Sequence, residues 1–255
     1  MARIFLCVLV FWGTLFADVR IPEPWNPGWF ELLGKNPARK ASGFQLGLVW
    51  TEPMEGVDYE VFGLFSEWGN SHYRLGASLA SSFLDSLYRS ENFEMDFSVA
   101  FSAFLFGAGG NVDIQVIPGE ATWWRTVGRA GISWNGFAPF SVGLWGNFPS
   151  DFESSSLAGN IFWIPGEKFW SEAALLYQRP QGFLFVFGEK IRLGTLELQG
   201  SIAYPGPRVG IGVSVGIRSW GAAFGVHRDG NYMNSKMGGL FYRKNPETYS
   251  LESKF

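Results

Sequence analysis

The sequence has little cysteine and, beyond its first residues, no long apolar run. Its single cysteine, Cys7, lies within the opening segment MARIFLCVLVFWGTLFADVR. A chain without that segment has no thiol, which excludes disulfides and thiolate chemistry. A membrane-spanning helix needs about 20 apolar residues, and no later segment approaches that length. If the protein crosses a membrane, we therefore expect it to cross as β-strands.

The opening segment itself has the features of a secretory signal peptide. Arg3 gives it a basic start, an apolar run extends from Ile4 to Phe11, and the small residue Ala17 precedes an aspartate. We predict that residues 1–17 are a signal peptide that is cleaved after Ala17. The alternative is a membrane-anchoring helix, for which the apolar stretch is short. Residues 18–41 then form a lead segment rich in proline and turn-forming residues, with a short helix expected at 29–33.

Charged residues are also scarce, at 17% of the chain, and no basic tract is present. Without the signal peptide the chain has a formal excess of four negative charges. Nucleic acid is therefore not an expected partner, because nothing is available to neutralise its phosphates. Aromatic residues are abundant by contrast, with 12 Trp and 25 Phe among 255 residues. A surface of this composition is poorly suited to water on every side.

Most of the chain from residue 42 onward alternates apolar and polar residues. In ENFEMDFSVAFSAF, the positions Phe93 to Ala103 of one face are apolar, whereas Asn92 to Ser102 of the other face are mostly polar. Successive side chains of a strand point to opposite faces, so this period predicts β-strands. We expect about fourteen strands, within a range of roughly 12 to 16. Their expected ranges are 42–51, 57–67, 72–82, 91–102, 105–117, 122–134, 138–147, 155–164, 168–178, 182–192, 195–204, 207–217, 219–228 and 235–243.

The polar faces of these strands carry glycines and charges of both signs, whereas the opposite faces carry Val, Ile, Leu, Phe and Trp. A sandwich would not favour glycine in mid-strand, because glycine adds no packing there. An apolar outer face with a polar inner face is typical of an all-β, antiparallel transmembrane β-barrel, here formed by residues 42–255. The candidate lumen-facing charges are Glu94, Asp96, Asp113, Arg125, Arg129, Lys190, Arg192, Glu197, Arg208 and Arg218.

Aromatic residues at strand ends and at the end of the chain agree with this prediction. Trp and Tyr near strand ends would form an interfacial girdle. The tail TYSLESKF, with Tyr249, Leu251 and Phe255, is similar to the sorting signal read by the barrel insertion machinery of outer membranes. We therefore expect a protein of a Gram-negative-type outer membrane, in contact with outer-membrane lipid and with the barrel insertion machinery. The alternative is a secreted, soluble all-β module that stacks carbohydrate on its Trp residues.

Two short motifs resemble a known group of proteins. NPA at residues 36–38 looks like the Asn-Pro-Ala element of the fatty-acid-transporter-like outer-membrane barrels. SLYRSENFEMDFSVAF is similar to a Leu-Tyr-Arg-Glu-Asn stretch of their relatives that are associated with type IX secretion, although Ser90 interrupts it here. The transporters of this group are larger, with an amino-terminal plug and long external loops, so the resemblance implies architecture more than substrate. The matching residues are Asn36, Pro37, Ala38, Leu87, Tyr88, Arg89, Glu91 and Asn92.

Nothing in the sequence indicates an enzyme. His72 and His227 lie in strand patterns without clustered carboxylates at metal-ligand spacing, and no serine is marked as a nucleophile. We expect no catalytic residue, cofactor or metal. The predicted function is that of a channel or carrier for small molecules, with hydrophobic cargo implied by the resemblance. The alternative is a non-conducting barrel that serves as a docking platform for a secretion or cell-surface protein partner.

Overall fold

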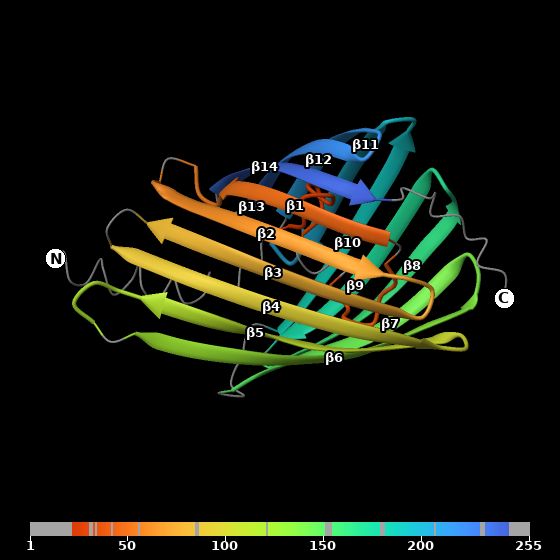
Figure 1. Ribbon diagram of the computed structural model, residues 1–255, viewed down its shortest axis with the longest axis horizontal. Coiled ribbons are helices and arrows are strands. Elements are labelled where there is room, and N and C mark those ends of the chain that lie inside the picture. The colour runs from red at the N-terminus through yellow and green to blue at the C-terminus, as the bar shows by residue number, and fades with distance from the viewer. Residues whose placement is uncertain are drawn as a thin grey trace.

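The structure, a computed structural model, describes residues 22–30, 33, 35–41, 43–55, 57–84, 87–120, 122–150, 155–178, 182–206, 208–229 and 233–244. Within these residues, fourteen antiparallel strands form one closed barrel, in which β1 pairs with β14 (Figure 1). The strands are β1 (Gly43–Glu52), β2 (Tyr59–Gly69), β3 (Tyr73–Leu84), β4 (Tyr88–Phe101), β5 (Phe104–Val116), β6 (Trp123–Phe137), β7 (Phe140–Pro149), β8 (Ser156–Gly166), β9 (Phe169–Gln178), β10 (Gly182–Leu193), β11 (Leu196–Tyr204), β12 (Arg208–Ile217), β13 (Trp220–Asp229) and β14 (Met233–Lys244).

The predicted fold class is confirmed, and the fourteen strands lie close to their expected ranges. The largest differences are at β4, which begins at Tyr88 rather than at residue 91, and at β6, which extends to Phe137 rather than to residue 134. The extension of β6 follows from a register shift between Trp134 and Phe137, because an irregularity of this kind lets a strand continue past a break in its pairing pattern.

Three sequence predictions fall wholly or partly outside the described residues. These are the signal peptide of residues 1–17, the sorting signal at Tyr249, Leu251 and Phe255, and part of the helix expected at 29–33. The described residues of that last range form bends and turns, with the amide of Leu33 donating to the carbonyl of Phe30 at 3.0 Å.

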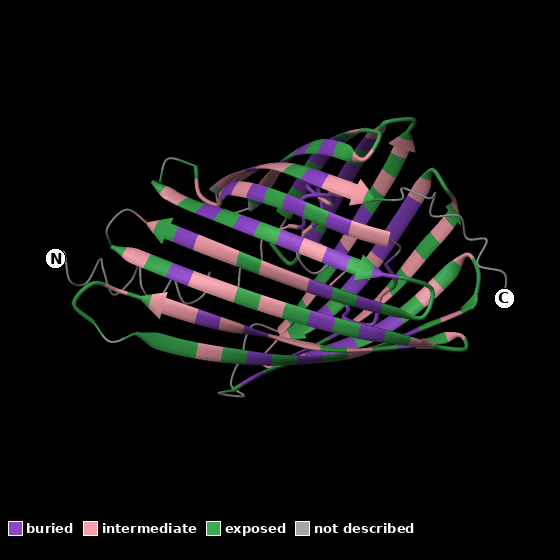
Figure 2. Cartoon of the chain, in the orientation of Figure 1, coloured by how far each residue is buried: buried purple, intermediate pink, exposed green. Residues whose placement is uncertain are grey.

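The two faces of the sheet differ as the alternation predicts. Along β4, Phe93, Met95 and Phe97 are exposed on the outside of the barrel, whereas Asp96 and Ser98 are buried inside it. The same banding of exposed and buried residues recurs along the other strands (Figure 2). The outer wall is therefore an almost continuous apolar surface, and the polar side chains and most glycines of the strands face the lumen.

The two ends of the barrel differ in how they connect the strands. At the end where β1 begins and β14 finishes, strands are joined by short turns such as 102–103, 194–195 and 218–219. Ser102, Gly194 and Arg218 have φ of 55°, 66° and 57°, the left-handed conformation that tight hairpin turns use. At the opposite end the connections include the longer segments 53–58, 117–122 and 150–155. We call these the turn end and the loop end.

The pairing of β1 with β14 that closes the barrel can be tested with engineered cysteines. Leu48 and Leu240 are directly opposed in the register, and both side chains are exposed on the outer face. Directly opposed residues of an antiparallel ladder have Cα atoms about 4.5–5.5 Å apart, a separation that a disulfide accepts. Leu48→Cys with Leu240→Cys should therefore cross-link in the folded protein, as measured by non-reducing electrophoresis after boiling.

Leu198, which is exposed on β11, supplies the matched control, because Leu48→Cys with Leu198→Cys places the two thiols on strands that do not pair. Equal cross-linking of both pairs, or none in either, would contradict the closed register.

Candidate functional site

The described residues of the lead segment, 22–30, 33 and 35–41, lie inside the barrel. Trp25, Trp29, Leu33 and Ala38 are buried, although these described residues have no regular secondary structure. A chain without helix or sheet pairing must satisfy its backbone polar groups through other partners. These partners come from the inner wall of the barrel, which defines the lumen and the lead together as the candidate site.

The last part of the lead is held by β6. The Asn36 amide donates to the Ser133 hydroxyl at 3.0 Å, and that hydroxyl in turn donates to the carbonyl of Ala38 at 2.6 Å. Asn36 also accepts a bond of 2.9 Å from the amide of Ala38, which fixes the turn at Pro37. The Asn-Pro-Ala motif is thus a structural element that seats the lead against one wall.

The earlier part of the lead is held by β11 and β13 on another side of the lumen. The backbone amide of Gly28 donates to the Gln199 side chain at 3.2 Å, and Ser201 donates to the Gly28 carbonyl at 2.7 Å. His227 Nε2 lies 2.9 Å from the carbonyl oxygen of Pro27. Inward-pointing side chains of β11 and β13 therefore supply hydrogen-bond partners for backbone groups of the lead.

Glycines of the wall make room for the lead. A Cβ atom at Gly107 would overlap the backbone of Pro37 and Ala38, and one at Gly212 would overlap that of Gly28. A Cβ at Gly225 would overlap the carbonyl of Pro27. At these three positions a glycine is required by the close approach of two backbones. Other inward glycines make room for side chains instead, as Gly109 does for Asp96 and Gly221 for the ring of Phe241.

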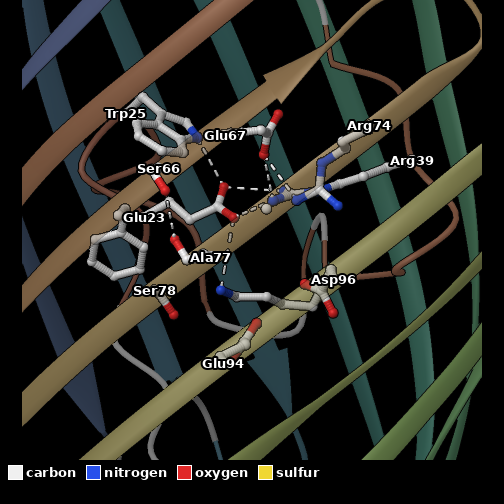
Figure 3. A pocket seen from close by; sticks show the side chains of 13 residues that line it. Glu23, Trp25, Arg39, Ser66, Glu67, Arg74, Ala77, Ser78, Glu94 and Asp96 are labelled. Atoms are coloured by element: carbon white, nitrogen blue, oxygen red, sulfur yellow. Dashed lines mark hydrogen bonds and ion pairs between the residues drawn. The ribbon is translucent and has the colours of Figure 1, made fainter.

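Ion pairs join the two ends of the lead to each other and to β2 and β3. Arg39 donates to Glu23 at 3.1 Å and to Glu67 at 2.9 Å, and Arg74 donates to Glu67 at 2.9 Å. Figure 3 shows the two carboxylates directed toward the guanidinium groups of Arg39 and Arg74. Burial alone would raise the pKa of Glu23, but the neighbouring charges of Arg39 and Lys35 outweigh it and hold that pKa well below its ordinary value. The Glu23 carboxylate therefore remains charged, and its ion pair with Arg39 joins the two ends of the lead into a closed loop, which we call the ring.

The rest of the lumen includes a charged sector and an apolar sector, and a second apolar cluster around Trp25, Val49 and Phe65 lies on β1, β2, β13 and β14. In the charged sector, on β4 to β6, Arg129 lies 2.8 Å from Glu94 and 3.1 Å from Asp96, and Ser90 donates to Asp113 at 2.7 Å. The apolar sector lies on β7 to β11 and packs against Trp29 and Leu33 of the lead. Its wall residues are Trp145, Ala158, Phe162, Ala174, Leu176, Leu184, Val186 and Ala203.

The candidate charges from the sequence occupy several places. Glu94, Asp96, Asp113, Arg125 and Arg129 face the lumen in the charged sector, and Lys190, Arg192 and Glu197 form a cluster inside the turn end. Arg208, the first residue of β12, is exposed at the loop end on the inner face, directly opposite the buried Ala203 of β11. Arg218 is exposed in the turn that follows β12, because the strand ends at Ile217.

The residues of the second family-like motif, which begins SLYRSEN, lie partly on the inner face and partly on the outer face of β4. Tyr88 and Asn92 belong to the inner face, whereas Arg89 and Glu91 lie outside near the loop end, 2.6 Å apart as an ion pair. Leu87 is exposed in the preceding turn. Trp25, Gly28 and Trp29 of the lead also lie in the lumen, which the sequence pattern did not predict; the only signal for them was the aromatic and proline content of the lead.

The described residues contain neither a candidate membrane-spanning helix nor a candidate metal site. No helix in this part of the chain has the length and apolar character to cross a membrane. No three histidine, cysteine, aspartate or glutamate side chains within the same residues are grouped so that they could hold a metal ion.

The fit of the lead against the wall can be tested at the glycines. Gly107→Ala and Gly212→Ala should each displace the lead, because overpacking of this kind costs about 1–3 kcal/mol. The expected result is faster cleavage of the lead by added protease in detergent-solubilised barrels. Gly200→Ala is the matched control, since a Cβ there meets nothing nearer than a carbonyl oxygen at 3.8 Å. Unchanged cleavage of the first two variants would contradict the close contact.

Comparisons with known proteins bear on the fold. No family model and no curated protein sequence matches the chain. The Pseudomonas putida toluene transporter TodX has a TM-score of 0.59 at 12% identity, over 81% of this chain and 90% of that chain. Its deltaS2S3 mutant, described as a monoaromatic hydrocarbon channel, has a TM-score of 0.60 at 12% identity, over 81% and 91%. The Acinetobacter baumannii outer membrane protein Omp33 has a TM-score of 0.58 at 8% identity, over 80% and 98%. The chain therefore has the fold of outer-membrane β-barrels of known structure.

Proposed function

We propose that the protein is an outer-membrane barrel that binds small hydrophobic molecules in its lumen and passes them across the membrane. The observation that carries this proposal is the apolar sector of the inner wall. The lumens of porins, which pass water and ions, are polar. The inward side chains of Trp145, Leu176 and Val186 are apolar and would not be expected in such a lumen.

The orientation in the membrane follows from the connections between strands. Outer-membrane barrels have short periplasmic turns and longer extracellular loops. The turn end, with both ends of the barrel chain, then faces the periplasm, and the loop end faces the outside. The exposed apolar outer wall contacts outer-membrane lipid, and we infer that the barrel insertion machinery assembles it there after export by a cleaved signal peptide.

The apolar sector has the composition of a ligand-binding wall. Leu184 and Phe162 are only partly buried, and with Phe30 of the lead they border the buried side chains of Val186 and Leu176. Apolar surface of this kind favours an uncharged hydrophobic solute, at roughly 25 cal/mol per Å² removed from water. Aromatic residues on both the wall and the lead suit a small aromatic ring.

The lead is the element that such a solute meets next on its way to the turn end. Trp29 packs on the apolar sector, and its indole nitrogen donates to the Glu189 carbonyl at 3.3 Å. Passage therefore requires the lead to shift within the lumen. The resemblance of Asn36, Pro37 and Ala38 to fatty-acid-transporter-like barrels, and the fold shared with a toluene transporter, support hydrophobic cargo and a non-enzymatic role.

Leu184 gives a direct test of this proposal. Leu184→Asn introduces a polar group into the apolar sector and should weaken the binding of toluene to the purified barrel about tenfold, which corresponds to about 1.4 kcal/mol. Toluene uptake into proteoliposomes should fall in parallel. Asn92→Ala, on the inner face of β4 in the charged sector, is the control and should leave both quantities unchanged. Equal toluene binding by wild type and Leu184→Asn would sink the proposal.

A second candidate is a non-conducting platform for a secretion or cell-surface partner, including a type IX secretion component. The ring closed by Arg39 and Glu23 favours it, because a held lead obstructs the lumen. This candidate predicts that cross-linking in intact cells recovers the barrel with one other protein in stoichiometric amount, as measured by mass spectrometry of the cross-linked band. Recovery of only the barrel itself would count against a platform.

A further inference from the structure

A cluster of three cations lies inside the turn end, closer to that end of β10 than Leu184 and Val186 of the apolar sector. Lys190 and Arg192 are on the inner face of β10, and Arg243 is on β14. All three converge on one carboxylate, that of Glu197. Its oxygens lie 3.2 Å from Lys190 Nζ and 3.8 Å from Arg243 Nη1, and Arg192 Nε donates to it at 2.9 Å.

The positive charge of this cluster exceeds its negative charge. Three cationic side chains share one acidic side chain, which leaves an excess of two positive charges within the contact distances just given. Ser214 and Asn26 complete the polar surroundings and are neutral: Ser214 lies 3.5 Å from Glu197, and Asn26 accepts from Lys190 at 3.2 Å. Uncompensated charge in a partly desolvated site attracts a counter-ion more strongly than the same charge in water.

Arg243 has hydrogen-bonding capacity that Glu197 does not use. Its separation of 3.8 Å from Glu197 exceeds hydrogen-bond length, and its Nε is buried without a hydrogen-bond partner among the described residues. Buried donors are normally satisfied, so an orphaned guanidinium nitrogen points to a missing acceptor. The side chains of Arg192 and Arg243 are each about a fifth exposed, which keeps them within reach of a solute.

Two aromatic rings pack against the cations of the cluster. Arg192 and Lys190 lie over the ring of Trp170, at 5.0 and 5.7 Å from its centroid, and Arg243 lies over Phe241 at 4.6 Å. These contacts hold the cations in place without neutralising them. The turn residue Lys168, whose carbonyl accepts from the Arg192 amide at 2.8 Å, adds another basic residue near this mouth.

We propose that Lys190, Arg192 and Arg243 form a binding site for the oxyanion of a small molecule, a carboxylate or a phosphate, at the turn-end mouth of the lumen. Arginine side chains match carboxylate and phosphate oxygens with paired donors, and a nearby lysine adds a point charge. Glu197 acts as the internal competitor that holds the three cations together when no anion is bound. The site does not depend on the apolar sector or on the passage of hydrophobic cargo.

The first measurement is calorimetric titration of the folded barrel in detergent with inorganic phosphate and, separately, with benzoate. The proposal expects saturable binding of at least one of them that weakens as sodium chloride is raised, because salt screens the interaction. Binding of phosphate alone assigns the site to free phosphate or phosphate esters, and binding of benzoate assigns it to carboxylates. Absence of both overturns the proposal without any variant being needed.

Two variants are expected to change the anion affinity in opposite directions. Arg243→Gln should weaken anion binding about tenfold, whereas Glu197→Gln should strengthen it about tenfold, because the second change removes the competing carboxylate. Arg89→Gln, which removes an exposed cation from the outer face near the loop end, is the matched control and should change nothing. Leu184→Asn should also leave anion binding intact, which separates this site from the proposed cargo site.

Folding of every variant is checked by the heat-dependent shift of its electrophoretic band, so that a loss of binding cannot be mistaken for a loss of the barrel. Equal affinities for wild type, Arg243→Gln and Glu197→Gln would overturn the proposal. So would binding of a polyglutamate peptide through Arg243 in a barrel that takes neither small anion, since the cluster would then dock an acidic protein segment.

Discussion

The arrangement of this protein depends on the contact between two backbones, that of the lead and that of the inner barrel wall. The described residues of the lead form no helix or strand, and turn bonds such as that from the Trp29 amide to the Asn26 carbonyl link some of their peptide groups. Other amides and carbonyls of the lead bond to Gln199, Ser201 and Ser133, which reach inward from strands far apart in the sequence. Such bonds require close approach, and close approach requires wall positions without a side chain, such as Gly107 and Gly212.

That contact also organises what is left of the lumen. Because Trp29 and Leu33 of the lead cover one side, the wall behind them can be apolar, with Val186 fully buried. On the other side Arg39 joins the lead to Glu67, and Glu94 and Arg129 add further charges to the wall. A second apolar cluster around Trp25 and Phe65 adjoins them, so the inner wall is divided into apolar and charged areas. The division supports selective binding of a solute in preference to unselective permeability.

The fold could be read from the sequence because its information is local. A period of two along Phe93, Met95 and Phe97 is visible in a few consecutive residues, and closure of the sheet follows from the need to leave no edge in lipid. The position of the lead could not be read in this way, since its partners lie up to 200 residues away, as in the contact between Pro27 and His227.

The candidate lumen-facing charges could likewise be predicted only where local alternation determines their position. Charges in mid-strand, such as Asp96 and Arg129, followed the alternation onto the inner face. Arg218 did not, because a tight turn with positive φ ends the strand one residue before it. Arg243 was overlooked, because its proximity to Glu197 arises from the barrel arrangement and leaves no signal in the sequence around it.

The lead is joined directly to β1 through Ala41, and this covalent link makes it an intramolecular ligand of its own barrel. A tether of a few residues holds such a ligand at an effective concentration in the millimolar range, whatever the amount of protein present. Any solute that displaces the lead competes with that concentration, and the lead returns as soon as the solute departs. The length of this connection is therefore one determinant of lumen occupancy, and shortening or lengthening it would change the apparent affinity for every competitor by the same factor.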